Sequence, residues 1–178
     1  MKKTFVILII SAFLPLATGL AYSATIPATG TVEVFFSPRG GATEAITREI
    51  ASAQREILIQ AYGFTSIPIA KALLESKKRG VKIEAVLDKS NATAKYSAAT
   101  FLFNAGIPVL IDSSHAIAHN KVMIIDRQTL ITGSFNFTRA AEEKNAENLL
   151  ILRGNKPLIE KYFDNYEAHK GHSTLYQR

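Results

Sequence analysis

The residues best suited to chemistry lie in one segment, AHNKVMIIDRQTLITGSFNFT, which covers residues 118–138. His119 and Lys121 stand at the head of an apolar run, and Asp126 closes that run. A cation inside an apolar strand costs free energy unless it is paired or used. Imidazole serves as a nucleophile or base near neutral pH, and an ammonium group holds a phosphate oxygen well. The segment therefore predicts a reactive site for an anionic substrate.

The same segment has the pattern of an antiparallel hairpin, with strands at 119–126 and 129–134 and a short turn between them. Residues two apart on a strand share a face, so His119 and Lys121 should project to the same side. Asp126 has the opposite parity and sits at the strand end, so it need not meet the other two.

Further polar positions follow the second strand. Ser134 and Asn136 share a face immediately after Gly133, and the chain then enters a helical turn. Asn136 or Thr138 is the expected N-cap, and free backbone N–H groups at such a turn favour an anion. A nucleophile or base, a fixed cation and two neutral hydrogen-bond donors on one surface would form a phosphate cradle.

The rest of the chain must position this segment, and strand-like and helix-like periodicities alternate along it. The expected strands are at 31–36, 56–63, 81–88, 107–112 and 147–154, and the expected helices at 41–54, 68–80, 93–104, 138–144 and 156–170. This order predicts an α/β fold, with a mixed β-sheet sandwiched between helices. No linker divides the sequence, so we expect one domain.

The first two dozen residues have the layout of a secretory signal peptide, with a basic start, an apolar run and small residues at Ala21 and Ser23. We predict a signal peptide at 1–23, a mature domain at 24–178 and a periplasmic or secreted protein. The alternative is an uncleaved membrane anchor, although the apolar run is near the lower length limit for a membrane span.

Charge and cysteine content narrow the classes of partner. The formal net charge is +6, and loss of Lys2 and Lys3 with the leader would leave about +4. A moderately basic domain suits a polyanion such as nucleic acid or an anionic lipid surface, although solubility alone could explain the charge. The chain has no cysteine, which excludes disulfides, thiol nucleophiles and thiolate metal ligands.

The spacing His119-x-Lys121-x4-Asp126, followed by Gly133-Ser134-x-Asn136, resembles the HKD signature of the phospholipase D superfamily. The signature is present without a departure. Because the chain is short, begins with a leader and carries one copy of the motif, it is similar to the secreted bacterial endonucleases of that superfamily, over essentially the whole mature domain. The resemblance implies a phospholipase D-like fold and a phosphodiesterase.

The resemblance also implies a mechanism. Members of the superfamily use two HKD motifs around one site, so a chain with one motif should form a homodimer that brings two copies of His119 together. One histidine would attack phosphorus and form a covalent phosphohistidine, and the other would protonate the leaving oxygen. Lys121 of both subunits, with Gly133, Ser134 and Asn136, would bind the phosphate. Neither metal nor cofactor is needed in this scheme.

The resemblance implies two further site residues, both acids. Asp126 would not contact the phosphate but would act as an orienting residue that ties the strand to the turn. Glu147 opens the next expected strand, and the family places an acid near there that hydrogen-bonds the histidine and fixes its tautomer. Glu142 and Glu143 lie close to it in the sequence, so the choice of Glu147 is the weaker assignment.

Alternatives remain open for the substrate. The leading hypothesis is a nonspecific endonuclease that hydrolyses DNA, with RNA as a further substrate. It would have no stable membrane association after signal cleavage. The first rival is a phospholipase D-type hydrolase that uses the same chemistry on phospholipids. The second is a non-catalytic periplasmic module that binds nucleic acid.

Other charged and titratable residues form weaker candidate sites. Residues 77–80, KKRG, suit a helix C-terminus better than a phosphate site. His115 lies four residues before His119, but in a loop that leads into a strand, while residues 169–172 with their two histidines look like a frayed tail. Neither pattern predicts a metal site. A carboxylate metal site would need the acids that close three strands, Asp88, Asp112 and Asp126.

Overall fold

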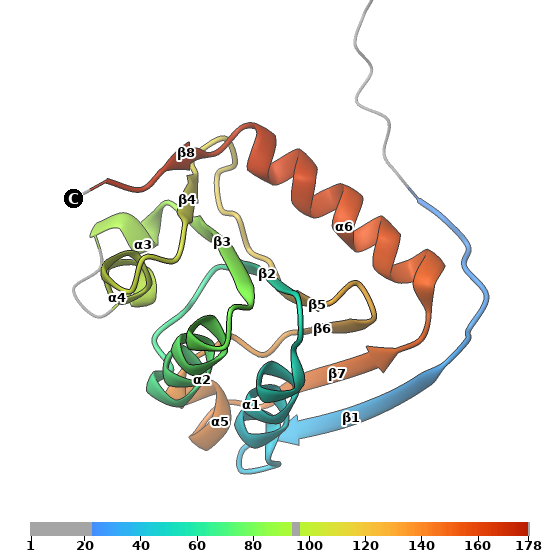
Figure 1. The fold of residues 1–178 in the computed structure, drawn as a ribbon. Coiled ribbons are helices and arrows are strands. Elements are labelled where there is room, and N and C mark those ends of the chain that lie inside the picture. Colours follow the sequence, from blue (N-terminus) through green and yellow to red (C-terminus); the bar gives the residue numbers. More distant parts are fainter. Residues whose placement is uncertain (1–22, 94–96, 178) are drawn as a thin grey trace, which may run out of the picture.

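The computed structural model describes residues 23–93 and 97–177 (Figure 1). The predicted signal peptide falls outside these residues, apart from Ser23. Within the described ranges, no helix is both long enough and apolar enough to cross a membrane.

The described residues form one mixed sheet of eight strands in the order β1-β7-β6-β5-β2-β3-β4-β8. β2, β3 and β4 run parallel to one another, and the other neighbouring pairs are antiparallel. The predicted mixed sheet is therefore confirmed. The strands are β1 (Thr31–Ser37), β2 (Glu56–Ala61), β3 (Lys82–Asp88), β4 (Val109–Asp112), β5 (Lys121–Ile125), β6 (Thr129–Gly133), β7 (Glu147–Arg153) and β8 (Thr174–Leu175).

Helices cover both faces of this sheet and complete the predicted sandwich. In Figure 1, α6 crosses one face while α1 and α2 lie against the other. The helices are α1 (Ala42–Ser52), α2 (Ile67–Lys78), α3 (Ser90–Thr93), α4 (Ala98–Asn104), α5 (Arg139–Glu143) and α6 (Lys156–Gly171).

Two apolar clusters hold the layers together. The larger includes Ile46 of α1 and Met123 of β5, and it fills the space between the sheet and α1, α2 and α4. The smaller joins Ile124 of β5 to Ile159 and Tyr166 of α6. Because both faces are covered, the central strands carry almost continuous apolar runs. Full burial of each such side chain stabilises the fold by roughly 1.5–3 kcal/mol.

The predicted hairpin of β5 and β6 is confirmed, with shifted boundaries. β5 begins at Lys121, so His119 lies in the loop before it. The turn begins at Asp126, because Asp126 and Arg127 both have positive φ, at 52° and 55°. Such a pair matches the twist of two hairpin strands, and aspartate tolerates it better than most residues.

The segments around α4 and the chain end also differ from the prediction. The helix expected at 93–104 is replaced by the short α3 and by α4, whose N-cap Ser97 accepts a hydrogen bond from the Ala99 N–H at 3.1 Å. The chain end is not a frayed tail, because α6 reaches Gly171 and β8 then pairs with β4. A strand of two residues carries no periodicity, so the sequence could not show it.

Candidate active site

The predicted reactive residues lie together at one end of the central strands, where β2 and β6 end and β5 and β7 begin. Lys121 pairs with Ala61 at the end of β2, and Glu147 opens β7 opposite Ser37. His119 lies two residues before Lys121, on the loop that connects β4 to β5. Antiparallel pairing thus brings residues from four strands to the same place.

Tyr62 joins His119 to Lys121. The Tyr62 and His119 rings lie 4.6 Å apart between centroids, at an interplanar angle of 55°. The Lys121 ammonium lies 5.3 Å from the centroid of the same tyrosine ring. The Tyr62 N–H donates to the Asn120 carbonyl at 2.9 Å, which fixes the tyrosine beside the loop. Tyr62 was not among the predicted site residues, because its contact with His119 depends on the pairing of β2 with β5.

Lys121 is a buried cation, with 6% of the residue exposed. Its Nζ donates to the His119 carbonyl at 2.8 Å. Burial lowers the pKa of Lys121, and the nearby negative charge of Glu147 opposes that shift. The backbone carbonyl therefore ties the ammonium to the same short segment that carries the imidazole, in surroundings where its charge acts strongly.

His119 is exposed, and among the described residues neither of its ring nitrogens has a hydrogen-bond partner. Glu147 was expected to bond it, but in this chain Glu147 accepts from Ser134 Oγ at 2.6 Å and from Asn145 Nδ2 at 3.0 Å. The expected contact between this acid and the histidine is thus not formed within one chain. A free imidazole at the surface can meet a substrate or a second subunit.

The two acids near Glu147 have other tasks. Glu142 accepts hydrogen bonds from the N–H groups of Gly41 and Thr43 and so caps α1. Glu143 forms an ion pair with Arg139, at 2.7 Å, on the surface of α5. Of the three, Glu147 is the acid that faces the site.

Ser134 is exposed and its hydroxyl belongs to a hydrogen-bonded group. Its hydroxyl donates to Glu147 and accepts from the Asn148 N–H at 3.0 Å. Gly133, just before it, has φ 146°, and a Cβ there would lie 2.3 Å from the Asn148 carbonyl. A side chain at Gly133 would therefore push apart the strands that hold Ser134 and Glu147 together.

Asn136 lies beside Gly63, which follows Tyr62 in the chain. A Cβ on Gly63 would lie 3.2 Å from the Asn136 amide oxygen, so the glycine gives the amide its room. That oxygen is buried and has no hydrogen-bond partner in the described part of the chain. A buried, unpaired amide is rare and suggests a ligand or partner that completes it.

Three of the N–H groups expected to form a cradle beyond β6 already have partners within the chain. The N–H groups of Ser134 and Phe135 both donate to the Asn148 carbonyl, and that of Phe137 donates to Gly63. The N-cap is Thr138, whose hydroxyl accepts from the Ala141 N–H at 3.1 Å. These N–H groups are already used, so phosphate binding would depend on side chains.

Asp126 does not belong to the reacting group. It lies at the far end of β5, where its carboxylate accepts from the N–H groups of Gln54, Arg55 and Glu56 at 2.7–2.9 Å. Burial raises the pKa of Asp126, but these hydrogen bonds outweigh it, so the pKa lies below its ordinary value. Asp126 fixes the start of β2 against the hairpin, a structural task.

The three-carboxylate metal site is not formed. Asp126 lies at one end of the strands, and Asp88 and Asp112 lie at the other end. Asp88 holds the loop before His119, since its carboxylate accepts from the Ala118 N–H at 2.8 Å. Asp112 instead meets three histidines.

The basic run at 77–80 has structural partners, as expected. Lys77 Nζ donates to the Ala105 carbonyl at 2.6 Å, and Arg79 donates to carbonyls at the end of α1. These cations match the free carbonyls of neighbouring helix ends.

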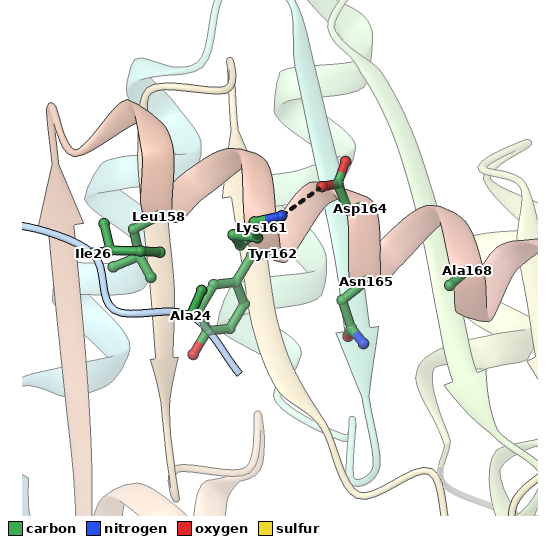
Figure 2. Close-up of a pocket in the computed structure, with 8 residues that line it drawn as sticks. All are labelled: Ala24, Ile26, Leu158, Lys161, Tyr162, Asp164, Asn165 and Ala168. Carbon is green, nitrogen blue, oxygen red and sulfur yellow. Dashed lines mark ion pairs between the residues drawn. The ribbon is translucent and has the colours of Figure 1, made fainter. Parts of the chain in front are cut away.

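A pocket of about 590 Å³ lies away from this site, between the first described residues and α6 (Figure 2). Ala24 and Ile26 face Leu158 and Tyr162 across it, and none of its lining residues belongs to the candidate site. Asn155 Nδ2 donates to the Pro27 carbonyl at 3.1 Å, which fixes this segment at the start of α6.

Known proteins are similar to this chain in sequence. The family model described as "Cardiolipin synthase, PLD-like domain" matches residues 46–169. A protein named phospholipase D from Rickettsia typhi is 41% identical over 82% of this chain and 71% of its own length. Its counterpart from Rickettsia prowazekii is 42% identical over 84% and 72%.

Solved structures show the same architecture. Nuc from Salmonella typhimurium, described as a phospholipase D family member, superposes with a TM-score of 0.80 and 38% identity, over 84% of this chain and all of that one. NucT from Helicobacter pylori gives a TM-score of 0.76 and 25% identity, over 83% and 99%. These matches confirm the fold that the motif implied.

Proposed function

Since the chain belongs to the phospholipase D superfamily, we propose that it is a metal-independent phosphodiesterase in which His119 attacks phosphorus. The observation that carries this proposal is that an exposed, unbonded imidazole and the buried ammonium of Lys121 both lie against the Tyr62 ring. A nucleophile next to a fixed cation suits attack on a phosphodiester, whose oxygens gain negative charge in the transition state.

The reaction takes two displacements. A neutral ring nitrogen of His119 forms a bond to phosphorus while the bond from phosphorus to the leaving oxygen breaks. The imidazolium of His119 of the partner subunit gives its proton to that oxygen. The partner's histidine, now neutral, takes a proton from water, and the hydroxide breaks the nitrogen–phosphorus bond. The two imidazoles must therefore differ in protonation when the reaction begins.

A homodimer follows from this chemistry. One chain supplies a single HKD motif and hence one imidazole, whereas the scheme needs a nucleophile and a separate acid. The unbonded His119 ring, which is exposed in one chain, is a group that a second subunit could complete.

The roles around the phosphate follow from the contacts. The Lys121 ammonium and the Nδ2 hydrogens of Asn136 would donate to the non-bridging oxygens. Ser134 already donates its hydroxyl to Glu147, so in this chain it positions that acid. Glu147 in turn opposes the loss of charge on Lys121, which keeps the ammonium available as charge develops on the phosphate.

We propose DNA as the main substrate, with RNA as a further one. The basic charge of the chain suits a polyanion, and the described residues contain no element that reads a groove. Affinity should then come mainly from phosphate contacts and fall with salt. The superpositions on Nuc and NucT over nearly their whole lengths support a member of similar size and architecture.

Phospholipid is the second candidate, and one surface feature favours it. Val32, Val34 and Phe36 form an exposed apolar row on β1, with Phe36 67% exposed and next to the residue that pairs with Glu147. The Rickettsia relatives are also named phospholipase D. An apolar row beside the site could contact a lipid surface.

Parallel assays separate these substrates. Plasmid DNA and phosphatidylcholine vesicles are incubated with the wild type, His119→Ala and Phe36→Ser. We expect faster turnover of DNA, no cleavage by His119→Ala and unchanged nicking by Phe36→Ser. Faster turnover of lipid that Phe36→Ser abolishes would reverse the substrate assignment. DNA binding without cleavage of either substrate would instead favour a non-catalytic module.

We also propose export, with residues 1–23 as a signal peptide and 24–178 as the mature domain. Expression of the full chain and N-terminal sequencing of the exported protein test this. A mature terminus between residues 22 and 25 is expected, and an intact leader on membrane-bound protein would favour the anchor.

A further inference from the structure

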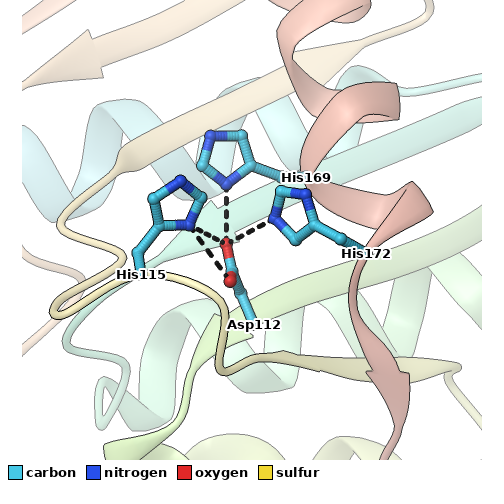
Figure 3. Close-up of side chains that lie close together, drawn as sticks. All are labelled: Asp112, His115, His169 and His172. Atoms are coloured by element: carbon cyan, nitrogen blue, oxygen red, sulfur yellow. Dashed lines mark hydrogen bonds and ion pairs between the residues drawn. The ribbon is translucent and has the colours of Figure 1, made fainter. Parts of the chain in front are cut away.

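Three histidines from two distant parts of the chain converge on one buried carboxylate (Figure 3). Asp112 ends β4 and its side chain is fully buried. His115 lies on the following loop, His169 in the last turn of α6, and His172 is the C-cap of that helix. The pairing of β8 with β4 brings the two segments together.

The nitrogens of all three rings point at the same oxygen. The distances to Asp112 Oδ2 are 2.7 Å from His169 Nδ1, 3.0 Å from His115 Nδ1 and 3.3 Å from His172 Nε2. The ring centroids lie 4.7–5.3 Å apart. From this convergence we propose that Asp112, His115, His169 and His172 bind a divalent transition metal ion, with Zn²⁺ as the best fit.

Hydrogen bonding is the competing explanation of the convergence. The Asp112 carboxylate offers about four lone-pair sites, and the Ser114 N–H with one N–H from each ring would fill them, since His115 Nδ1 also lies 3.2 Å from Oδ1. Protonation of all three rings would, however, leave an excess of positive charge beside one carboxylate. Three neutral imidazoles with a carboxylate present four lone pairs to one point, which is a ligand set for a cation.

The spacing and the donor types fit zinc. One ligand atom from each of the four residues lies within 4.8 Å of the others. A tetrahedral Zn²⁺ with bonds of about 2.0–2.1 Å needs ligand atoms roughly 3.4 Å apart. The side chains of His115 and His172 are 44% and 37% exposed, so both can move inward. Imidazole ligands favour zinc and its neighbours over Mg²⁺ or Ca²⁺, which prefer oxygen.

The surroundings hold the ligands as a structural metal site requires. The Ser114 N–H donates to Asp112 Oδ1 at 3.0 Å and orients the carboxylate. The His115 carbonyl accepts from Lys89 Nζ at 3.1 Å, and the His169 carbonyl accepts from Ser173 Oγ at 2.7 Å. These contacts orient the carboxylate and fix the backbone that carries His115 and His169. Four protein ligands would fill a tetrahedron, so this ion would be structural and would have no open position for substrate.

The position suggests what the ion does. It would tie the end of α6 to the loop at 113–118, and that loop leads directly into His119. Asp88 already holds the other end of the loop through Ala118. The proposed ion therefore fixes the approach of the catalytic histidine from outside the active site, and it takes no part in the displacement.

Metal binding to the whole chain tests the site without relying on activity. The wild type is stripped with EDTA, dialysed against Zn²⁺ and measured for bound zinc by mass spectrometry; Co²⁺ then reports four-coordination by its visible absorption. The chain has four histidines, so His119→Gln is a matched control for His172→Gln. We expect about one ion per chain in the wild type and His119→Gln, and at least a tenfold weaker site in His172→Gln.

Melting temperatures provide the second readout. Zn²⁺ at about 100 times its dissociation constant should raise Tm of the wild type by about 5–10 °C and that of His172→Gln far less. In EDTA the two should melt within about 4 °C, which shows that the variant folds. No bound zinc in the wild type, equal binding by His172→Gln, or loss of binding in His119→Gln would overturn the proposal.

Discussion

Replacement of Lys121 by methionine probes the buried ammonium beside His119. Methionine keeps the unbranched apolar stem and removes the charge and its hydrogen bond to the His119 carbonyl. Loss of one preorganised donor costs transition-state stabilisation of about 2.7–4 kcal/mol, or 10²–10³-fold in rate. A shared site would lose two ammonium groups at once, so we expect kcat/KM to fall by at least about 10³-fold.

The fold should tolerate this change. The lost hydrogen bond contributes about 1 kcal/mol, and the contact with Tyr62 about 0.5–1 kcal/mol. Removal of a charge from a site only 6% exposed offsets part of that loss. We therefore expect the free energy of unfolding to change by no more than about 1 kcal/mol, which shifts Tm by about 2–4 °C.

The assay is steady-state hydrolysis of a small aryl phosphodiester, which separates catalysis from binding to a polyanion. Lys156→Met is the matched control, because Lys156 is exposed at the start of α6 and its loss changes the net charge equally. That control should keep its full rate. If Lys121→Met retained kcat/KM within threefold of the wild type, the role assigned to this ammonium would be refuted.

Three further changes test other parts of the site and fold. Wild-type subunits are exchanged with an equal amount of His119→Asn, and the activity is compared with that of the same total amount of wild type. About one quarter should remain if both histidines act in one site, and about one half if each chain acts alone. Asp126→Asn should lower Tm by about 3–6 °C near neutral pH. The folded-state pKa of Asp126 is depressed, so its contribution to stability is present above the ordinary value of 3.8 and is lost as pH falls below it. The difference in Tm between the wild type and Asp126→Asn should therefore shrink at low pH. A difference that stays constant with pH would contradict the structural role given to the Asp126 carboxylate. Gly133→Ala should lower both Tm and kcat, because a Cβ would meet the Asn148 carbonyl; unchanged melting and turnover would show that the loop can yield.

The sequence predicted the sheet and the reactive residues because both depend on local patterns. Apolar runs and turn residues located most strands and helices within a few residues. Spacing brought His119 and Lys121 into one site. Strand parity correctly predicted that Asp126 would lie apart from His119 and Lys121. The reason was incomplete, because Asp126 belongs to the turn and its carboxylate binds the N–H groups at the start of β2.

Long-range contacts decided the rest. Whether the N–H groups beyond Gly133 are free depends on Asn148, which lies on another strand. Tyr62 meets His119 only because β2 pairs with β5. The histidines at 169 and 172 looked like part of a loose end, because nothing near them in the sequence reveals the pairing of β8 with β4.

Detection of a phosphate adduct on His119 tests the proposed chemistry most directly. Wild-type protein is mixed with radiolabelled DNA and quenched within milliseconds in alkaline denaturant, in which a phosphohistidine survives, and the labelled peptide is identified by mass spectrometry. We predict a covalent adduct on His119 that forms and decays at the rate of turnover, and none in His119→Ala. Turnover of DNA without an adduct, or an adduct on another residue, would contradict the assignment of His119 as the nucleophile.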